Sequence, residues 1–414
     1  MITLNTENLC VGYENKAIVD DINIKLIKGE NLCLLGPNGA GKTTILRTLS
    51  KLLNPIKGAV YIEGQNIKDI QNKELSKKMS VVLTNKFNGG LMTVFDVVSM
   101  GRYPYTGFFG YLGKKDREKI SEALKTVNAE DIAKSYFDEL SDGQKQKVLV
   151  ARALVQEPDV IVLDEPTTHL DIKHRLELIE ILRTLTKEKG ITVILSLHEI
   201  DMALKSCDKV ALVNKGKIIA YGTPEDVVDE KTIEELYEIK EANFNNLLGS
   251  IELSNSNKPR AFVIGGSGYG ASIYRVLTKY NIGFYTGVLH ENDIDYEIAR
   301  TIGLPILKEN AFEGIKDENI KKAQEMIDDV PFVIDSACPI GDINKNNLQL
   351  ISYALSKDKK VFSFRKKEEC IKLYGEASKN IECIEGMYTL AEKFLSYIDE
   401  ESIRKSVEGE CKNC

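Results

Sequence analysis

Residues 36–44 read Gly36-Pro37-Asn38-Gly39-Ala40-Gly41-Lys42-Thr43-Thr44. This stretch matches the pattern G-x-x-x-x-G-K-[ST], in which glycines let the backbone curl until successive N–H groups point inward at phosphate oxygens. Lys42 adds a positive charge for the outer phosphates, and Thr43 offers a hydroxyl oxygen to Mg²⁺. The nine residues are therefore predicted to hold a nucleoside triphosphate together with its magnesium ion.

The residues on either side of this loop fit the same interpretation. Residues 30–35 include a short apolar run suited to a buried strand, and residues 44–49 have helical spacing. A helix that begins at the loop adds partial positive charge beside the phosphates. A glycine-rich turn without a ligand is the alternative, which the eight-position pattern in the order strand, loop, helix disfavours.

Composition limits the classes of protein to consider. The 414 residues exceed one ordinary domain, and 43% hydrophobic with 28% charged residues is typical of globular proteins. A net charge of −7 disfavours a nucleic-acid partner, which needs basic patches. We expect no membrane-spanning helix and no signal peptide, because no apolar run approaches ~18 residues and the N-terminus is polar. The eight cysteines are expected to be reduced core thiols in the cytosol.

The chain reads as two globular units. Residues 1–247 mix short apolar strands with helical stretches, and residues 260–400 form a second unit of the same kind. Residues 248–259 are rich in Ser, Asn and Gly and end in proline, which predicts a linker. Residues 401–414 form a charged, polar tail.

A second motif supplies two carboxylates. Residues 160–171 read VIVLDEPTTHLD, so that four apolar residues of a predicted buried strand lead directly into Asp164 and Glu165. Phosphoryl transfer to water needs a partner for Mg²⁺ and a group that orients the attacking water. Asp164 suits the metal, directly or through water, and Glu165 suits the attacking water, as general base or as the group that orients it. The alternative is an acidic turn after a strand.

A third motif lies between the first two. Residues 140–148 read LSDGQKQKV, and a helical stretch follows. A serine and a glycine just before a helix can bind phosphate through the hydroxyl and the backbone N–H groups. The same pattern also makes an ordinary helix cap, so the motif alone is less specific.

Together these motifs resemble the nucleotide-binding domain of ABC transporters, over residues 1–247. The resemblance implies a P-loop NTPase fold of class α/β, with a RecA-like core and a helical subdomain, and ATP with Mg²⁺ as ligands. It also implies a head-to-tail homodimer, in which Ser141, Gly143 and Gln144 contact the ATP bound by the partner subunit. A Rossmann-like α/β domain is expected to follow.

The resemblance assigns three further positions. Tyr13 falls where the family stacks an aromatic ring on adenine, and Asp171 matches the family's D-loop. His198 matches the switch histidine near the γ-phosphate. Taken alone, His198 reads as a structural histidine, and its place in the motif order reverses that reading.

Two positions depart from the family pattern. Asp142 replaces the first glycine of the family's Leu-Ser-Gly-Gly-Gln motif, and we expect its carboxylate to point away from the phosphate, toward the helix N-terminus. Thr84 stands where the family has a glutamine that contacts Mg²⁺ and senses the membrane partner. Thr84 offers a shorter oxygen ligand for the metal. The other catalytic residues are intact, so ATP hydrolysis is still predicted.

Residues 91–105 indicate a subfamily. This stretch, with Gly101-Arg102-Tyr103-Pro104, resembles the helical subdomain of ATPases that serve importers of iron–siderophores, haem and cobalamin. The resemblance implies a groove for an integral-membrane permease and an indirect role for a substrate-binding protein. It places the chain on the cytoplasmic face of the membrane. The aromatic residues here could instead be local core: Tyr103, Tyr105, Phe108 and Phe109.

Two other classes stay open. One is a soluble ABC ATPase without a permease, but such proteins usually carry coiled-coil insertions or tandem ATPase domains, and neither is visible. The other is an efflux ATPase, which residues 101–104 disfavour. Co-purification with a permease separates both from an importer.

The second unit repeats the order strand, glycine loop, helix. Gly266, Gly268 and Ala271 have the spacing G-x-G-x-x-A of a dinucleotide-binding fold, and Glu291 follows as a candidate ribose ligand. Three interpretations stay open: a turn needed only for packing, a binding site for a nucleotide or another phosphate-bearing metabolite, and an enzyme. Our hypothesis is a sensor of a cytosolic metabolite linked to the imported chelate. Cys338 follows a predicted strand and reads as a core thiol.

The tail ends in Cys411 and Cys414, which have the spacing of metal ligands. Two thiolates do not complete a four-ligand zinc or iron site. A flexible, reduced tail is therefore the favoured interpretation.

Overall fold

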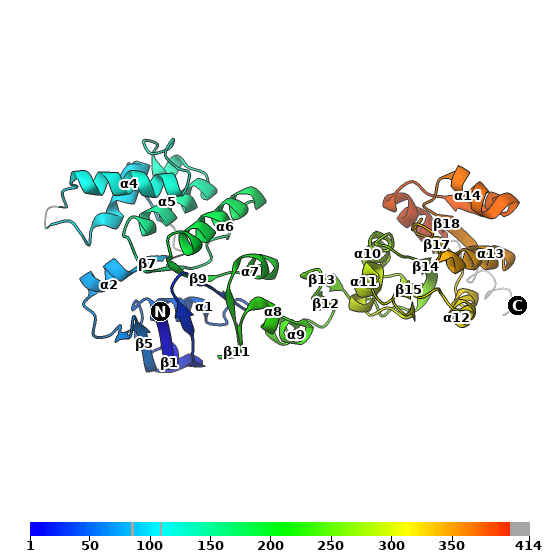
Figure 1. Cartoon of the computed structure of the whole chain (residues 1–414), viewed down its shortest axis with the longest axis horizontal. Helices are drawn as coiled ribbons and strands as arrows, with labels where there is room; N and C mark the ends of the chain where they lie inside the picture. The colour runs from blue at the N-terminus through cyan, green and yellow to red at the C-terminus, as the bar shows by residue number, and fades with distance from the viewer. Residues whose placement is uncertain (84–86, 108–109, 398–414) are drawn as a thin grey trace, which may run out of the picture. The chain divides into compact units, whose positions relative to one another are not determined.

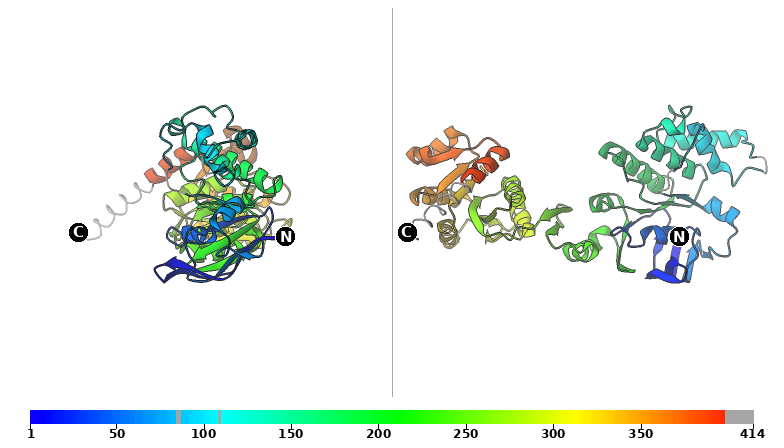
Figure 2. Two further views of the ribbon diagram at one scale, coloured as in Figure 1. Left: turned by 90° about the vertical axis from the view of Figure 1, so that its left-hand side faces the viewer. Right: turned by 180° about the vertical axis from the view of Figure 1, so that it is seen from behind.

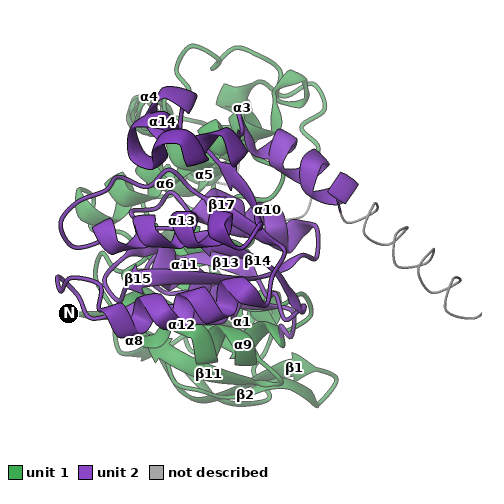
Figure 3. Ribbon diagram, turned by 90° about the vertical axis from the view of Figure 1, so that its right-hand side faces the viewer, with its two compact units in different colours: residues 1–238 green, residues 239–414 purple. Residues whose placement is uncertain are grey.

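The computed structural model describes residues 1–83, 87–107 and 110–397. It divides the chain into two compact units, Met1–Glu238 and Ile239–Cys414 (Figure 3). The division falls after Glu238 and not at residue 247. Five residues singled out in the sequence lie outside the described ranges. They are the candidate metal ligand Thr84, the aromatic residues Phe108 and Phe109, and the terminal pair Cys411 and Cys414.

The segment expected to be a linker contains regular structure. Strands β12 (Ala242–Asn245) and β13 (Ser250–Leu253) form an antiparallel hairpin within unit 2. The Nδ2 group of Asn243 donates to the carbonyl of Thr301 at 2.6 Å, and that of Asn245 donates to the Thr301 hydroxyl at 2.8 Å. Within residues 248–259 themselves, Asn255 is buried, and its Nδ2 group donates to the carbonyl of Ile282 at 2.9 Å. The polar composition that suggested a linker therefore includes a side chain that makes a buried hydrogen bond.

The central sheet of unit 1 positions its motifs (Figure 1). In spatial order its six strands are β11 (Lys217–Gly222), β10 (Lys209–Asn214), β4 (Asn31–Leu35), β9 (Thr192–Ser196), β8 (Val160–Leu163) and β7 (Met79–Val82). All are parallel except β11. Every residue of β4, β8 and β9 is buried, as unbroken apolar runs predict for parallel strands. The carboxyl ends of these strands therefore meet at one edge.

A second, antiparallel sheet covers helix α1 (Lys42–Leu49). In spatial order its strands are β2 (Lys16–Ile22), β1 (Ile2–Tyr13), β5 (Lys57–Ile62) and β6 (Gln65–Asn66), with β3 (Lys25–Ile27) also paired to β1. Ile45 and Leu49 of α1 share one core cluster with Leu9 of β1 and Leu34 of β4. The helix that follows the phosphate-type loop is thus held between two sheets.

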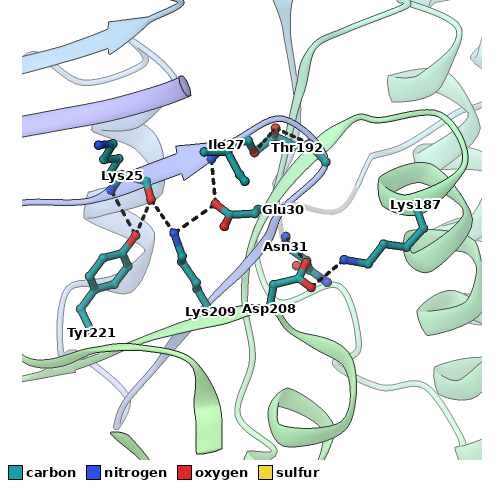
Figure 4. Close-up of polar contacts among 10 residues, drawn as sticks. Lys25, Ile27, Glu30, Asn31, Lys187, Thr192, Asp208, Lys209 and Tyr221 are labelled. Atoms are coloured by element: carbon teal, nitrogen blue, oxygen red, sulfur yellow. Dashed lines mark hydrogen bonds and ion pairs between the residues drawn. The ribbon is translucent and has the colours of Figure 1, made fainter. Parts of the chain in front are cut away.

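A polar network joins β3 to the central sheet at the end remote from the loop (Figure 4). The Glu30 carboxylate accepts from the Ile27 amide at 2.7 Å and from Lys209 Nζ at 3.1 Å. The hydroxyl of Tyr221 donates to the Lys25 carbonyl at 2.6 Å, and Lys209 donates to the same carbonyl at 3.0 Å. Because Glu30 directly precedes β4, these contacts fix the amino end of the strand that carries the loop.

The remaining helices of unit 1 include the expected helical subdomain. Their bounds are α2 (Asn72–Lys78), α3 (Val94–Ser99), α4 (Lys114–Thr126), α5 (Asp142–Leu154), α6 (Ile172–Lys187), α7 (Ile200–Ser206), α8 (Pro224–Val227) and α9 (Glu230–Tyr237). Arg102 is buried and ties the subdomain together: its guanidinium donates to Asp116 at 2.9 Å and to the Val155 carbonyl at 2.8 Å. No described helix is both long and apolar enough to cross a bilayer.

Unit 2 contains a parallel sheet with the predicted doubly wound order. Its strands in spatial order are β16 (Ile306–Glu309), β15 (Gly283–His290), β14 (Pro259–Ile264), β17 (Phe332–Asp335), β18 (Lys360–Ser363) and β19 (Ile381–Cys383). When the strands of this sheet are numbered along the chain from β14, their spatial order is 3-2-1-4-5-6, as in dinucleotide-binding folds. The Rossmann-like prediction is therefore confirmed at the level of fold.

Helices cover both faces of this sheet (Figure 2). Their bounds are α10 (Ala271–Lys279), α11 (Ile294–Ile302), α12 (Asp317–Asp328), α13 (Leu348–Ser356) and α14 (Lys367–Tyr374). Alternate residues of β14 face opposite cores: Val263 packs with α10 and α11, whereas Phe262 packs with α12 and α13. This alternation explains why the central strand reads as a continuous apolar run.

Candidate nucleotide-binding site

The loop at residues 36–44 has the predicted order of strand β4, turn and helix α1. Gly41 is the N-cap of α1 and has a φ of 104°. A Cβ added there would lie 2.5 Å from Val19 Cγ2 and 2.9 Å from Ile18 Cγ2, so strand β2 leaves room only for glycine. The backbone curl and the close approach of β2 both depend on this residue.

Lys42 is almost fully buried beneath the loop. Its ammonium donates to the carbonyls of Gly36 at 2.7 Å and Pro37 at 3.1 Å. Burial lowers the pKa of Lys42, and the nearby carboxylates of Glu165 and Asp164 oppose that shift. The loop therefore holds its own cation at the centre of the curl.

A chain of oxygen contacts links the loop to the next two strands. Thr43 Oγ1 donates to Asp164 Oδ1 at 3.1 Å, and Ser196 Oγ donates to the same carboxylate oxygen at 2.9 Å. Ser196 Oγ also accepts from the backbone N–H of Glu165 at 2.9 Å. Sequence reasoning missed Ser196. Its only signal was a hydroxyl at the end of a buried strand, two residues before His198.

Glu165 and His198 lie together, as the motif order predicts. His198 Nε2 is 2.9 Å from Glu165 Oε1, and both side chains are partly exposed. Glu165 has a φ of 48°, a left-handed conformation that is uncommon for a non-glycine residue. The bond from its backbone N–H to Ser196 helps to hold that turn, which points the carboxylate at the loop.

A cavity of about 290 Å³ lies over the loop. Its lining residues are Ile18, Asn38, Gly39, Ala40, Gly41, Lys42, Thr43, Thr44 and Glu165. Tyr13, at the end of β1, is exposed and is not part of this lining. It belongs to the hairpin whose second strand supplies Ile18. The cavity therefore has a polar floor of backbone amides and one carboxylate at its side.

The third motif forms the N-cap of α5 and does not line this cavity. Ser141 Oγ accepts from the Gln144 amide at 3.3 Å, and Gln144 Oε1 accepts from the Ser141 amide at 3.0 Å. Asp142 lies exposed in the first turn of α5, in line with the expected orientation toward the helix N-terminus. The loop and this motif are therefore separate surfaces of unit 1.

His174, which sequence reasoning missed, connects Gly143 with Asp171. The His174 ring packs so closely on Gly143 that any larger side chain would collide with it. Asp171 Oδ1 accepts from the backbone N–H of His174 at 2.8 Å and lies 2.8 Å from its Nδ1. Asp171 is also the N-cap of α6. The D-loop residue and the α5 motif thus form one cluster.

The glycine loop of unit 2 is arranged differently. The amides of Gly266 and Gly270 each donate to Asp295 at 2.7 Å, and the amide of Ala271 donates to the same carboxylate at 2.9 Å. Glu291, the expected ribose ligand, instead pairs with Lys308 at 2.6 Å.

Asp293 and Cys338 lie beside the same loop. Asp293 Oδ2 accepts from the Ser267 amide at 2.7 Å. Cys338 is buried next to Gly266, and burial raises the pKa of its thiol to about 11. Within the described ranges, no cluster of His, Cys, Asp and Glu side chains could hold a metal ion.

Comparisons with protein families match each unit separately. The ABC transporter family model matches residues 19–168, and the MJ0874 family model matches residues 284–399. The ABC transporter ATP-binding protein MJ0873 of Methanocaldococcus jannaschii is 47% identical over 288 residues, which cover 69% of this chain and 99% of that protein.

Two relatives are named for iron chelates. The ferric enterobactin transport ATP-binding protein FepC of Escherichia coli is 35% identical, over 57% of this chain and 88% of that protein. The iron(3+)-hydroxamate import ATP-binding protein FhuC of Bacillus subtilis is 36% identical, over 58% of this chain and 89% of that protein.

Two solved structures resemble this chain over about the same fraction of its length as these two relatives. A metal-chelate type ABC transporter in an inward-facing conformation is 28% identical with a TM-score of 0.52, over 58% of this chain and 90% of that chain. The ADP conformation of MJ1267, an ATP-binding cassette of an ABC transporter, is 26% identical with a TM-score of 0.52, over 56% and 98%.

Proposed function

This chain belongs to the ABC transporter ATP-binding proteins, and on that premise we propose that it is the ATP-hydrolysing subunit of an importer for an iron chelate. Members of the family are ATPases coupled to transport. Relatives named for ferric enterobactin and iron(3+)-hydroxamate support a siderophore as the cargo. Haem and cobalamin are the other candidates, because residues 91–105 resemble importers of all three.

The residues around the loop fit ATP with Mg²⁺. Residues 38–44, with Lys42 among them, line the cavity, and their backbone N–H groups and the Lys42 ammonium would match the charge of a triphosphate. Thr43 Oγ1 and Asp164 Oδ1 lie 3.1 Å apart, and these two oxygens would hold Mg²⁺. When bound, the ion neutralises charge on the outer phosphates. Its removal by a chelator is expected to abolish turnover.

The position of Glu165 is the observation that carries the catalytic proposal. Its carboxylate lines the cavity, and its backbone is fixed through Ser196 to the same Asp164 that faces Thr43. A carboxylate in this place can accept a proton from a water that attacks the terminal phosphate. His198, two residues beyond the end of strand β9, lies 2.9 Å from this carboxylate and holds it in position.

Separation of the loop from the α5 motif supports a composite site. Ser141, Gly143 and Gln144 do not line the cavity of their own chain. In a head-to-tail homodimer they would close the site of the partner subunit, with Asp171 at the joint. We therefore propose that ATP binding closes a homodimer and that hydrolysis reopens it.

Exposed apolar side chains on the helical subdomain support a permease partner. Leu91 is 90% exposed and Tyr103 is 72% exposed, and Tyr111 is also exposed. Buried Arg102 fixes the backbone beside Tyr103 through Asp116 and Val155. A rigid base below exposed apolar groups suits a surface that receives a helix of a membrane subunit. A peripheral position on the cytoplasmic face of the membrane follows from this partner.

Co-purification tests the importer proposal against its alternatives. The full-length chain with an affinity tag is isolated from detergent-solubilised membranes of its own cells. We expect an importer permease in the eluate, and Tyr103→Ala with Leu91→Ala should reduce its amount. A control variant carries Ile27→Ala, at an exposed apolar residue of strand β3 outside the helical subdomain. An eluate without a permease supports the soluble ATPase, and one with an exporter supports the efflux ATPase.

A further inference from the structure

The fold of unit 2 implies a dinucleotide. Its parallel sheet has the order 3-2-1-4-5-6, and the loop between β14 and α10 has the spacing G-x-G-x-x-A. In this fold the pyrophosphate lies on the amides of the glycine loop, at the N-terminus of the first helix. Whether unit 2 can take such a ligand depends on whether those amides are available.

The amides are already bound by the chain itself. Asp295 is 0% exposed, and its two carboxylate oxygens accept from the amides of Gly266, Gly270 and Ala271. Asp293 accepts from the Ser267 amide and, through its other oxygen, from the Asp295 amide at 2.9 Å. Four amides of the loop therefore donate to two carboxylates from the start of α11.

Close contacts account for two glycines of this loop, Gly265 and Gly270. A Cβ added to Gly270 would lie 2.6 Å from the Tyr274 hydroxyl oxygen and 2.9 Å from Asp295 Oδ2. A Cβ added to Gly265 would also meet the Tyr274 hydroxyl. Tyr274 is itself buried and bonded to Thr286 at 2.7 Å. These two positions thus need glycine because Tyr274 and Asp295 approach them, without any ligand.

A pyrophosphate on this loop would face two costs. It would have to displace the carboxylate from the amides that it needs, and it would bring further negative charge beside Asp293 and Asp295. Once displaced, Asp295 would also be left buried without the three amides that now donate to its carboxylate. The group that the fold family implies therefore does not fit these residues.

We propose that Asp295 is a built-in anion that fills the phosphate cradle of unit 2, so that this unit binds no dinucleotide through its glycine loop. The carboxylate acts as a shared cap, because it belongs to α11 and satisfies amides at the start of α10. The sequence leaves three interpretations open for the loop, and this proposal favours the first of them, a glycine turn needed only for packing. It is independent of the function proposed for unit 1.

Calorimetry on the full-length chain tests the exclusion. Saturating ADP and Mg²⁺ first occupy the site of unit 1, and the protein is then titrated with NAD⁺, NADP⁺ or FAD up to about 1 mM, the weak end of specific affinities. We expect no saturable heat. Saturable heat together with slower amide exchange at residues 265–271 overturns the proposal. Heat without a change at these residues shows binding elsewhere and leaves the loop excluded.

Amide hydrogen exchange tests the internal cap directly. In the wild-type chain the amides of Gly266, Gly270 and Ala271 should exchange slowly. In Asp295→Ala their exchange should rise about tenfold or more, because hydrogen bonds to a charged acceptor are lost. Glu291→Gln, a change at an exposed acid of the same segment, should leave them unchanged. Fast exchange in the wild type, or no change in Asp295→Ala, overturns the proposal.

A milder variant covers the case in which Asp295→Ala does not fold. Asp293→Asn alters the acceptor of one loop amide, that of Ser267, and leaves the Asp295 contacts in place. We expect faster exchange at Ser267 and unchanged exchange at Gly270. Equal acceleration at both positions, or at neither, contradicts the assigned contacts.

Discussion

The loop at residues 36–44 in unit 1 and the loop at residues 265–270 in unit 2 both follow a buried parallel strand, and both lead into a helix. They differ in the charge placed next to their amides. In unit 1 the buried ammonium of Lys42 lies under the loop, and a cavity of about 290 Å³ lies over it. In unit 2 the carboxylate of Asp295 occupies the amides.

This difference separates two properties that a glycine pattern combines. Glycines specify a curled backbone with N–H groups on its inner side. The neighbouring side chain decides whether that nest receives an external anion or the chain's own carboxylate. A cation beside the nest favours the first outcome, and an aspartate at the start of α11 produces the second.

The largest expected effect is on turnover at the unit 1 loop. Glu165→Gln keeps the shape of the side chain but removes its ability to take a proton from water. Steady-state phosphate release should fall about 10²–10⁴-fold, the contribution of a positioned general base. ATP affinity, measured by equilibrium binding, should be retained. Glu188→Gln, at an exposed acid of the same unit, serves as the control. A Glu165→Gln protein with wild-type turnover would show that another group activates the water.

The corresponding change at the unit 2 loop affects stability and not catalysis. Asp295→Ala leaves three amides without their charged acceptor, and the free energy of unfolding of unit 2 should fall by about 3 kcal/mol. Urea unfolding of the full chain, followed by hydrogen exchange in unit 2, measures the loss. ATPase activity should stay at the wild-type level. Glu291→Gln, in an exposed ion pair, should shift stability by only ~0.5 kcal/mol.

Lys42→Ala tests the opposite neighbour. Removing the ammonium takes one charged contact from the bound phosphates, so the Kd for ATP should rise about 30-fold, equivalent to ~2 kcal/mol. Equilibrium binding of a fluorescent ATP analogue measures the change. Lys57→Ala, at an exposed lysine in the same unit, should bind ATP like the wild type. Unchanged ATP affinity in Lys42→Ala would mean that the amides alone provide the binding energy.

The sequence predicted where the unit 1 motifs lie on the fold, because they follow buried strands. Residues 36–44, Asp164 and His198 each come after an apolar run, and parallel strands bring such positions to one edge. Ser196 and His174 were missed, because each acts through a contact between separate elements and belongs to no spacing pattern. The α5 motif was found, but its role depends on a partner subunit.

Prediction was weaker in unit 2, where composition and spacing misled. Spacing selected Glu291, whereas the carboxylate that reaches the loop is that of Asp295, four residues later. Composition predicted a linker at residues 248–259, although this segment contains strand β13 and the buried Asn255, whose side chain donates to the Ile282 carbonyl. In both cases a polar side chain makes hydrogen bonds inside the fold. Composition and spacing do not distinguish such a side chain from one that faces solvent.

Glu309 is a second carboxylate of unit 2 that accepts from backbone amides, and its pKa differs in direction from that of Asp295. Burial alone would raise the pKa of Glu309. Hydrogen bonds have the larger, opposite effect and lower its pKa to about 2; they come from the amides of Lys316 and Asn310 and the side chain of Asn319. Asp295 shows the reverse balance, because burial outweighs its amide contacts and raises its pKa. Burial and the neighbouring Asp293 therefore oppose ionisation of Asp295, whereas the hydrogen bonds of Glu309 outweigh its burial.

The smallest expected effect follows from this lowered pKa. Since the folded-state pKa of Glu309 lies below its ordinary value of 4.5, its contribution to stability is present above pH 4.5 and is lost as the pH falls toward 2. Between pH 7 and pH 3.5 the contribution should shrink by about 1 kcal/mol. The loss appears as the difference between the wild type and Glu309→Gln in urea unfolding at the two pH values. Glu291→Gln should follow the wild-type profile, because its carboxylate is exposed. If Glu309→Gln also follows that profile, the amides of Lys316 and Asn310 do not bind an ionised carboxylate, and unit 2 uses only one of its acids as an internal anion.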